Sequence, residues 1–343
     1  MNTMSGELNQ SNKKLVWDFW AALETGSKAE VFDSCVSVMA PDMPWNGPDP
    51  INALLGPEAF ATEFWLPFSA AFSNPQRESH LFFGGPSNGR KDGQKDGRMW
   101  VCGTGYFKGV FSHDWLGIPA SGNNVRIRWG EFCLVENGRI TAIYFLLDLV
   151  DLLRQAGFAV LPPDRGEQGV WPAPNNDNGV LLAGQDEDES DRTLKLIRSF
   201  LFEGLNVYDE KNLESMGVAN YFHPGVQWYG PGGIGACDGL RQFEELHQRH
   251  WLHAFPDRAV QDLDCLFAEG SYTGGSGWAA VHATQKGQYL DCPATGRRLV
   301  VNGLDFWRRE GDQFTENWVF VDMVHLFRQF GVDLFDRIQK ISS

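Results

Sequence analysis

Two aspartates, Asp148 and Asp322, are the residues whose type and position best suit acid–base chemistry. Each follows an apolar run that indicates a strand and precedes a helical pattern, over 149–157 and 323–331. A carboxylate among aromatic side chains is desolvated, and desolvation raises its pKa toward neutral pH. Such a group can remove a proton next to a carbonyl and return it elsewhere, as isomerisation, dehydration and aldol cyclisation require. The competing interpretation is that both aspartates cap the helices that follow them.

Other polar and aromatic side chains are expected to line the same pocket. Glu131 and Asp305 occupy equivalent places in two similar segments and could form a second polar wall, or be salt-bridged or solvated carboxylates instead. Trp45 and Trp228 each precede a Gly-Pro turn and could form a wall of the mouth, with core packing as the alternative. His282 lies on a strand predicted to line the pocket. The predicted ligand-contacting residues are Trp318, Glu316, Trp228, His282, Asp305, Tyr144, Trp45 and Glu131.

A hairpin turn sets the expected direction of these side chains. Residues 136–139 read Glu-Asn-Gly-Arg, and Asn-Gly favours a two-residue type I′ turn. An uninterrupted ladder from this turn places Tyr144 opposite Glu131 and Asp148 opposite Ile127. Because residues two apart share a face, Glu131, Tyr144 and Asp148 are predicted to point the same way.

Histidine and cysteine spacing does not predict a metal site. His247, His250 and His253 are spaced by three, but no acidic or cysteine partner occurs at matching spacing. The six cysteines are scattered without CxxC spacing, so neither a zinc site nor a catalytic thiol is expected. No metal and no cofactor are predicted.

The segments that carry these residues are two copies of one domain. An offset of 183 residues places WNGPDPINALLGPEAF (45–60) on WYGPGGIGACDGLRQF (228–243). Further along, an offset of 174 aligns LVDLLRQAG (149–157) with MVHLFRQFG (323–331). The offset changes because the first copy has an extra stretch over 84–98, rich in Gly and charge, which reads as an elongated hairpin loop.

Length and patterning predict the architecture. The chain has 343 residues, which suits two domains: copy one over 11–160, a Pro-, Gly- and acid-rich linker over 161–189, and copy two over 190–340. Three helices followed by a curved antiparallel sheet predict an α+β cone whose mouth lies between sheet and helices. The expected helices are 28–38, 57–72, 209–217 and 239–254, with an amphipathic helix at the start of each copy. The expected strands are 78–84, 98–111, 125–136 and 139–148, then 260–269, 276–287, 298–309 and 313–322.

The closing motifs of copy two resemble those of a known family. That copy has Phe-Pro-Asp over 255–257, Ala-Thr-Gly over 294–296, and the frame Glu-x-Trp-x-x-x-Asp over 316–322. These motifs are similar to those of the SnoaL-like polyketide cyclases, in the nuclear-transport-factor-two-like superfamily of cone folds. The first copy keeps the final aspartate but has Ala at 142 and Tyr at 144 where copy two has Glu and Trp.

The resemblance implies a cone-shaped α+β barrel in each copy and the role of general acid and base for Asp322 and Asp148. Because the frame is complete in copy two, that copy is expected to be the active half. Residues 283–287 read Ala-Thr-Gln-Lys-Gly where the family has Gly-Thr-His-Thr-Gly, so the family histidine is missing. Members of this superfamily often dimerise through their sheets, which implies an internal pseudo-dimer here and allows further homo-oligomers.

Composition excludes several partners. The formal net charge is −15, whereas phosphate binding and anionic membranes require basic surfaces, so no nucleic-acid or membrane partner is predicted. The stretch MNTMSGELNQSNKK is polar and lacks a signal core, and no apolar run is long enough to span a membrane. A cytoplasmic protein is expected.

The expected function is a cofactor-free acid–base enzyme of cyclase, isomerase, dehydratase or hydrolase type. Its partner would be a small, largely apolar carbonyl or polyketide-like compound. The alternatives are a non-catalytic small-molecule binding protein of the same fold and a purely structural pseudo-dimer. A cavity with Asp322 at its wall would favour catalysis, and a cone filled by Trp318 and Phe320 would favour the structural alternative.

Overall fold

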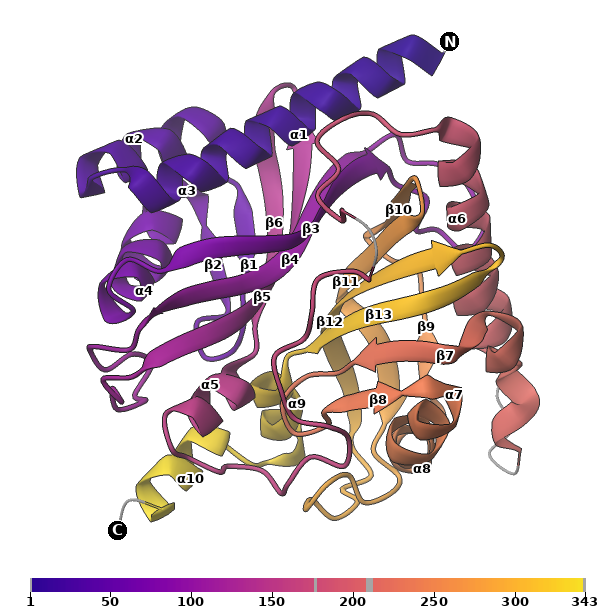
Figure 1. Ribbon diagram of the computed structural model, residues 1–343. Helices are drawn as coiled ribbons and strands as arrows, with labels where there is room; N and C mark the ends of the chain where they lie inside the picture. The colour runs from indigo at the N-terminus through magenta and orange to yellow at the C-terminus, as the bar shows by residue number, and fades with distance from the viewer. Residues whose placement is uncertain (1, 176–177, 208–211, 342–343) are drawn as a thin grey trace.

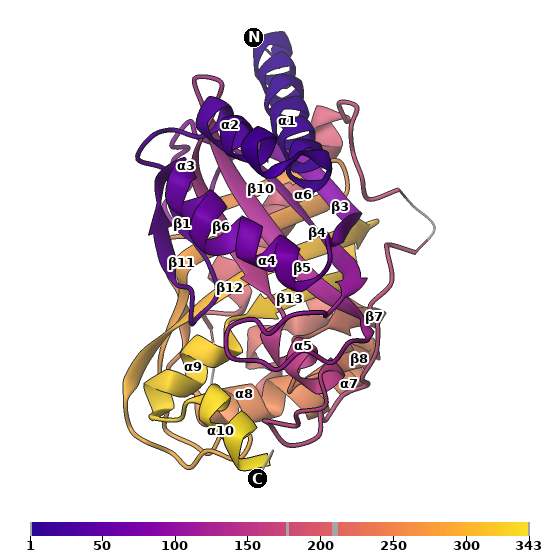
Figure 2. The same cartoon turned by 90° about the vertical axis from the view of Figure 1, so that its left-hand side faces the viewer.

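The computed structural model describes residues 2–175, 178–207 and 212–341 and contains two α+β domains (Figure 1). Figure 2 shows α1 and α2 of the first domain toward the top of the molecule and α8, α9 and α10 of the second domain toward the bottom. This confirms the predicted α+β class with one sheet in each copy. None of the helices in the described ranges combines the length and the apolarity that a membrane crossing needs.

Domain one contains the first six strands. Its elements are α1 (Asn2–Thr25), α2 (Lys28–Val38), β1 (Pro44–Asn46), β2 (Ala53–Leu55), α3 (Gly56–Ala59), the π-helical η1 (Phe60–Trp65), α4 (Leu66–Ala71), β3 (Gln76–Pro86), β4 (Met99–Val110), β5 (Asn124–Glu136), β6 (Arg139–Leu147) and α5 (Leu149–Gln155).

Domain two repeats this order. Its elements are α6 (Glu187–Ser199), η2 (Phe200–Gly204), η3 (Leu213–Met216), η4 (Val218–Asn220), β7 (Phe222–Tyr229), β8 (Ala236–Asp238), α7 (Gly239–Gln242), η5 (Phe243–Gln248), α8 (Arg249–Ala254), β9 (Ala259–Val260), β10 (Cys265–Glu269), β11 (Tyr272–Thr284), β12 (Arg298–Glu310), β13 (Gln313–Val321), α9 (Met323–Phe330) and α10 (Leu334–Ile341). Part of the predicted helix 209–217 lies outside the described residues, and the predicted strand 260–269 is two strands.

The two sheets have equivalent strand orders, β2-β1-β6-β5-β4-β3 and β8-β7-β13-β12-β11-β10, with β9 also paired to β11. The prediction of an antiparallel sheet is wrong at one strand pair in each domain, because β1 lies parallel to β6 and β7 lies parallel to β13. The strands β1, β2, β7 and β8 were not predicted. Three of them, β1, β2 and β8, have only three residues, which is too short to show an alternating pattern.

A one-residue bulge changes the predicted direction of the side chains. The turn at 136–139 has the expected pairing, but Thr141 is an extra residue on β6, so Glu131 lies opposite Phe145 rather than Tyr144. Domain two has the same bulge at Thr315, which places Asp305 opposite Val319. A shift of one residue moves every later side chain to the other face of the sheet. The predicted common face for Glu131, Tyr144 and Asp148 is therefore wrong.

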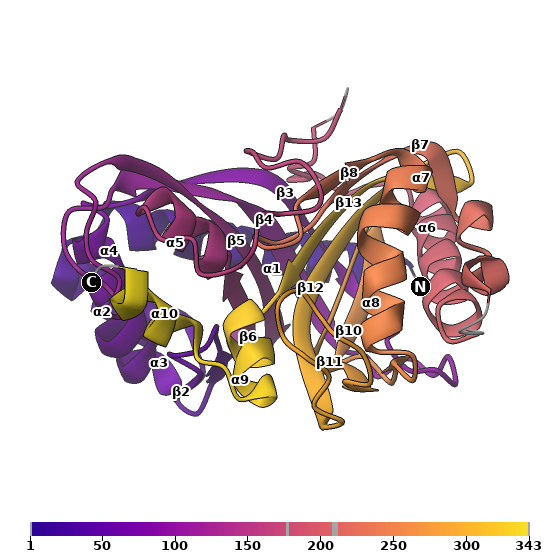
Figure 3. The same ribbon diagram turned by 90° about the horizontal axis from the view of Figure 1, so that it is seen from below.

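The two sheets pack against each other in the middle of the molecule, with helices on the outer sides (Figure 3). Phe132 of β5 contacts Phe306 of β12, with ring centroids 5.0 Å apart. Gly130 permits this close approach, because a Cβ there would lie only 3.0 Å from the Leu304 side chain. Each sheet thus has one face toward the other domain and one face toward its own helices.

Candidate functional site

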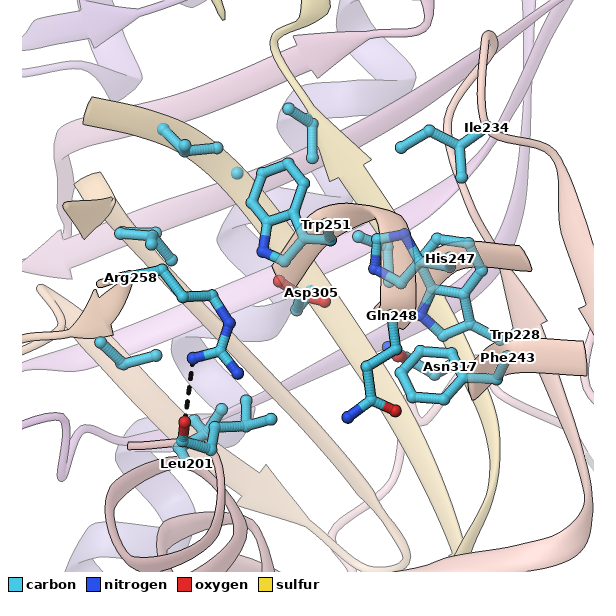
Figure 4. A pocket seen from close by; sticks show the side chains of 18 of the residues that line it. Leu201, Trp228, Ile234, Phe243, His247, Gln248, Trp251, Arg258, Asp305 and Asn317 are labelled. Atoms are coloured by element: carbon cyan, nitrogen blue, oxygen red, sulfur yellow. Dashed lines mark hydrogen bonds between the residues drawn. The ribbon is translucent and has the colours of Figure 1, made fainter. Parts of the chain in front are cut away.

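Domain two encloses a cavity of about 170 Å³ between its sheet and its helices. The sheet contributes side chains from β11, β12 and β13, and the helical segments η5 and α8 cover them from the other side (Figure 4). The bulge in β13 decides which sheet residues face this space. The cavity-lining polar and aromatic residues that matter below are Trp228, His247, Gln248, Trp251, Asp305 and Asn317.

Asp305 is the acid at the cavity wall. It lies on β12 beside Asn317 and opposite Val319, which also line the cavity. Its side chain is half-buried, and the surface it retains faces the cavity rather than bulk water. Burial raises the pKa of Asp305 to about 7, while the neighbouring Asn317 amide and the Arg128 guanidinium oppose this rise. Asp305 can therefore both accept and donate a proton at neutral pH.

His247 is the second titratable group at the cavity. Its imidazole stacks on the indole of Trp228, with centroids 4.2 Å apart, and it lies on the same side of the cavity as Trp228 and Phe243 (Figure 4). Burial lowers the pKa of His247 to about 3, helped by the positive charge of Arg258. A neutral imidazole offers one donor and one acceptor nitrogen.

Two further polar atoms of lining residues are unusual. Gln248 Oε1 and Trp307 Nε1 are buried and have no hydrogen-bond partner among the described residues. Unpaired indole nitrogens also occur at Trp45 and Trp129 in the packed core of domain one, so these atoms do not by themselves mark a ligand site. In the described ranges, no three His, Cys, Asp or Glu side chains are grouped as metal ligands would be.

The two final-strand aspartates lie elsewhere. Asp322 is buried, and its carboxylate accepts hydrogen bonds from the backbone N–H of His325 at 3.0 Å and of Asp49 at 2.9 Å. Burial raises its pKa to about 7, against the effect of these two bonds. Asp148 likewise accepts from Asp151 N–H at 3.1 Å and from Gly232 N–H at 2.9 Å.

Each of these aspartates therefore caps a helix and also binds a loop of the other domain. Neither Asp322 nor Asp148 lines the cavity, which corrects their predicted placement at the pocket wall. The bulges at Thr141 in β6 and Thr315 in β13 are the reason, because each moves the residues that follow it to the opposite face of its sheet.

The same shift moves two more predicted pocket residues to the domain interface. Trp318 packs against Tyr229, and its indole N–H donates to the carbonyl of Pro172 at 3.2 Å. Glu316 is ion-paired with Arg308. Both side chains contact the connecting segment, Trp318 through Pro172 and Glu316 through the backbone N–H of Asn175, and neither lines the cavity.

Tyr144 and His282 are also away from the cavity. The hydroxyl of Tyr144 donates to the carboxylate of Asp264 at 2.9 Å, and its ring stacks on Trp278. His282 is half-buried on β11, next to the lining residue Val281 and on the opposite face of the strand. Of the predicted pocket residues in copy two, the structure brings Trp228 and Asp305 together.

In domain one the corresponding space is filled. Arg77 lies over the rings of Trp20 and Trp129, at 4.2 and 4.1 Å from their centroids, and binds the carboxylate of Glu131 at 3.0 Å. Both partners of this ion pair are buried. The indole of Trp45 stacks on Phe64, 4.5 Å away between ring centroids. Trp45 and Glu131 are thus parts of a packed core.

Sequence reasoning missed most of the helical wall. Phe243, His247 and Trp251 are four residues apart and so lie on one face of a helix. This aromatic and histidine stripe, on the helix facing the sheet, is the signal that could have identified them.

Comparison with known proteins assigns the fold family. Residues 204–330 match the family model of the SnoaL-like polyketide cyclases, so domain two is a SnoaL-like domain. Domain one carries a second copy of the same strand order. The predicted family is confirmed. A comparison with curated proteins finds no match.

Several solved structures resemble one domain of the chain. A protein from Jannaschia sp. CCS1, classed as a SnoaL-like polyketide cyclase, is 18% identical, covers 43% of this chain and 99% of its own, with a TM-score of 0.37. A protein from Acidithiobacillus ferrooxidans, classed as a polyketide cyclase, is 23% identical, covers 41% of this chain and 94% of its own, with a TM-score of 0.34.

Proposed function

We propose that domain two is an acid–base enzyme of cyclase, isomerase or dehydratase type, in which Asp305 transfers the proton. Its substrate is a small, largely apolar carbonyl or polyketide-like compound. The observation that carries this proposal is a carboxyl with a pKa of about 7 at the wall of an apolar cavity. Catalytic acids and bases are often found as strongly perturbed groups in such clefts.

The side chains around Asp305 suit this chemistry. The ionised carboxylate removes a proton from the carbon next to the carbonyl, and the protonated carboxyl returns it at another atom. The negative charge that develops on the carbonyl oxygen requires a hydrogen-bond donor. The neutral imidazole of His247 has one N–H available for this role, since its pKa lies near 3.

The size of the cavity limits the substrate. An engineered cavity of about 150 Å³ in another protein holds benzene, so about 170 Å³ suits a compound with roughly one ring. The aromatic walls formed by Trp228 and Trp251 favour an apolar ring. A compound without negative charge is favoured, because the carboxylate of Asp305 would repel an anion.

Exchange of carbon-bound hydrogen tests the proposal without knowledge of the product. A panel of one-ring β-keto compounds and aryl ketones is incubated with the protein in D₂O, and loss of the proton next to the carbonyl is followed by NMR. Asp305→Asn should slow catalysed exchange by at least about a hundredfold, as expected for loss of a general base. Asp322→Asn is the matched control and should retain exchange, because Asp322 does not line the cavity.

Two results would contradict the proposal. Equal exchange by Asp305→Asn and the wild-type protein would remove Asp305 from the mechanism. Tight binding of the compounds without any exchange in the wild-type protein would instead support the non-catalytic binding protein.

A further inference from the structure

We propose that domain one positions the mouth loop of the domain-two cavity, with Asp148 as the main positioning residue. The mouth loop is defined as residues 230–235, between β7 and β8. This inference rests on the proposed function, because it assigns domain one a role at that same cavity. Domain one is then a structural part of the site rather than a second active copy.

The mouth loop forms part of the cavity wall. Pro231 and Ile234 both line the cavity, so the position of this loop sets the size of the space. The loop has the sequence Gly-Pro-Gly-Gly-Ile-Gly, and Gly233 and Gly235 have φ values of 92° and 83°. A loop so rich in glycine has many accessible conformations and needs external contacts to hold one of them.

Those contacts come from domain one and from the segment that follows it. Asp148 accepts a hydrogen bond from Gly232 N–H at 2.9 Å, and Asp164 accepts one from Gly233 N–H at 2.9 Å. The guanidinium of Arg128 donates to the carbonyl of Gly230 at 2.9 Å.

Backbone hydrogen bonds from the connecting segment, residues 161–189, also hold the mouth loop and the start of β8. Gly166 N–H donates to the carbonyl of Ile234 at 3.0 Å, and Glu167 exchanges two backbone hydrogen bonds with Ala236. Gly230, Gly232, Gly233 and Ile234 of the mouth loop thus bind groups outside domain two, while the carbonyl of Pro231 accepts from the amides of Ile234 and Gly235 within the loop.

The approach of Asp148 to the mouth loop is close. A Cβ on Gly232 would lie 2.9 Å from Asp148 Oδ1 and 2.8 Å from the backbone nitrogen of Asp151. Only glycine fits at this point, so the sequence of the mouth loop is matched to the surface of domain one. Asp148 is itself buried, where a hydrogen bond to a charged group is strong.

A matched contact exists on the other side of the molecule. Asp322 binds Asp49 N–H as Asp148 binds Gly232 N–H, and Asp49 and Gly232 are separated by the repeat offset of 183. That contact holds a loop of domain one, where the space between sheet and helices is filled by Arg77. Loss of this contact is not expected to alter the domain-two mouth loop.

The experiment compares Asp148→Asn with Asp322→Asn. Asparagine keeps an oxygen for the helix cap but presents an amide group to the loop N–H. In Asp148→Asn, amide hydrogen exchange at Gly232 and Gly233 should become about tenfold faster, as expected for loss of one buried hydrogen bond to a charged group. Exchange at both amides should be unchanged in Asp322→Asn.

Ligand size supplies the second measurement. Binding of acetophenone, with one ring, and 2-acetonaphthone, with two, is measured by NMR titration. Asp148→Asn should lower the preference for the smaller ketone by at least about threefold, a change of about half a decade in the ratio of dissociation constants. The Asp322→Asn protein should keep the wild-type preference. Asp164→Asn, which acts on the adjacent amide, is the second variant if Asp148→Asn fails to fold.

The outcomes separate the two proposals. Unchanged amide exchange in the mouth loop of a folded Asp148→Asn or Asp164→Asn protein overturns the inference. Faster exchange with an unchanged preference for the small ketone also overturns it, since the loop would not shape the cavity. If the wild-type protein binds neither ketone, the proposed function fails, while the amide exchange still decides whether domain one holds the loop.

Discussion

The two domains place a carboxyl at the same point of the sheet, Glu131 on β5 and Asp305 on β12. In domain one, Arg77 pairs with Glu131. In domain two, Val260 takes the place of Arg77, because it pairs with Val281 as Arg77 pairs with Phe107. A buried carboxyl needs either a cation or a proton, and the two domains show these two solutions.

The side chains around Glu131 in domain one are larger than those around Asp305 in domain two. Phe107, Trp129 and Phe145 of domain one correspond to Val281, Gly303 and Val319 of domain two at the offset of 174. Phe107 and Trp129 pack around Arg77, and Phe145 packs against Trp45 and Phe64, whereas the smaller set lines the cavity. One fold therefore yields a solid core or a binding space by a few changes of side-chain size.

The largest expected effect is in domain one. Arg77→Val should lower the free energy of unfolding by about 3–5 kcal/mol, because Glu131 would be buried without its partner. Arg77→Val combined with Glu131→Gln should recover part of this loss. Urea denaturation checks both, and a loss below about 1 kcal/mol in the single variant would show that the ion pair is unimportant.

In domain two, Asp305→Asn is expected to raise the free energy of unfolding, whereas Arg77→Val lowers it. Folding raises the pKa of Asp305 to about 7. The protonated carboxyl therefore contributes fully to the free energy of unfolding below the unfolded pKa of about 4, and this contribution is lost as the pH rises to 7. The variant should therefore be more stable than the wild-type protein at pH 8, on the order of 2 kcal/mol, with little difference at pH 4. Denaturation at both pH values measures this, and a difference independent of pH would contradict the raised pKa.

A smaller effect is expected from filling the cavity. Val319→Phe places in domain two the residue that domain one has at Phe145, and should weaken acetophenone binding by about tenfold or more, roughly 1.4 kcal/mol. The reverse change, Phe145→Val, should not create a binding site, because Trp45 and Phe64 pack at that position and Arg77 fills the space beside Trp129. NMR titration of both variants tests the comparison, and undiminished binding by Val319→Phe would place the ligand outside the cavity.

The smallest expected effect concerns His247. His247→Phe keeps an aromatic ring against Trp228 but removes the N–H, so hydrogen exchange of the ketone should slow by about tenfold, or 1.4 kcal/mol, with stability little changed. Since the pKa of His247 is about 3, the pH–rate profile should show one inflection near pH 7 in both proteins. A second inflection near pH 6 that disappears in His247→Phe would show that the histidine titrates there.

Much of the fold follows from local patterns. The repeat, the long strands and the hairpin at 136–139 are visible in the sequence, because apolar alternation and an Asn-Gly turn are properties of neighbouring residues. The capping role of Asp148 and Asp322 is also local, and it was recognised as one of two interpretations. Asp305 was expected at a polar wall of the pocket, and the structure places it at the cavity.

Other features depend on contacts between distant residues. The bulge at Thr315 turns Trp318 and Glu316 away from the cavity, and the bulge at Thr141 moves Tyr144 to the face opposite Glu131. No turn or spacing signal in the sequence predicts either bulge. That Asp148 binds Gly232 depends on how the two sheets pack together.

The sequence by itself determined that two similar α+β domains form and that each has an acid in its sheet at Glu131 or Asp305. Only the tertiary structure decided which acid is paired with Arg77 and which faces a cavity. The reason is physical: strand and helix patterns reflect local backbone preference, whereas an empty space depends on the summed volumes of side chains that meet from five or more elements.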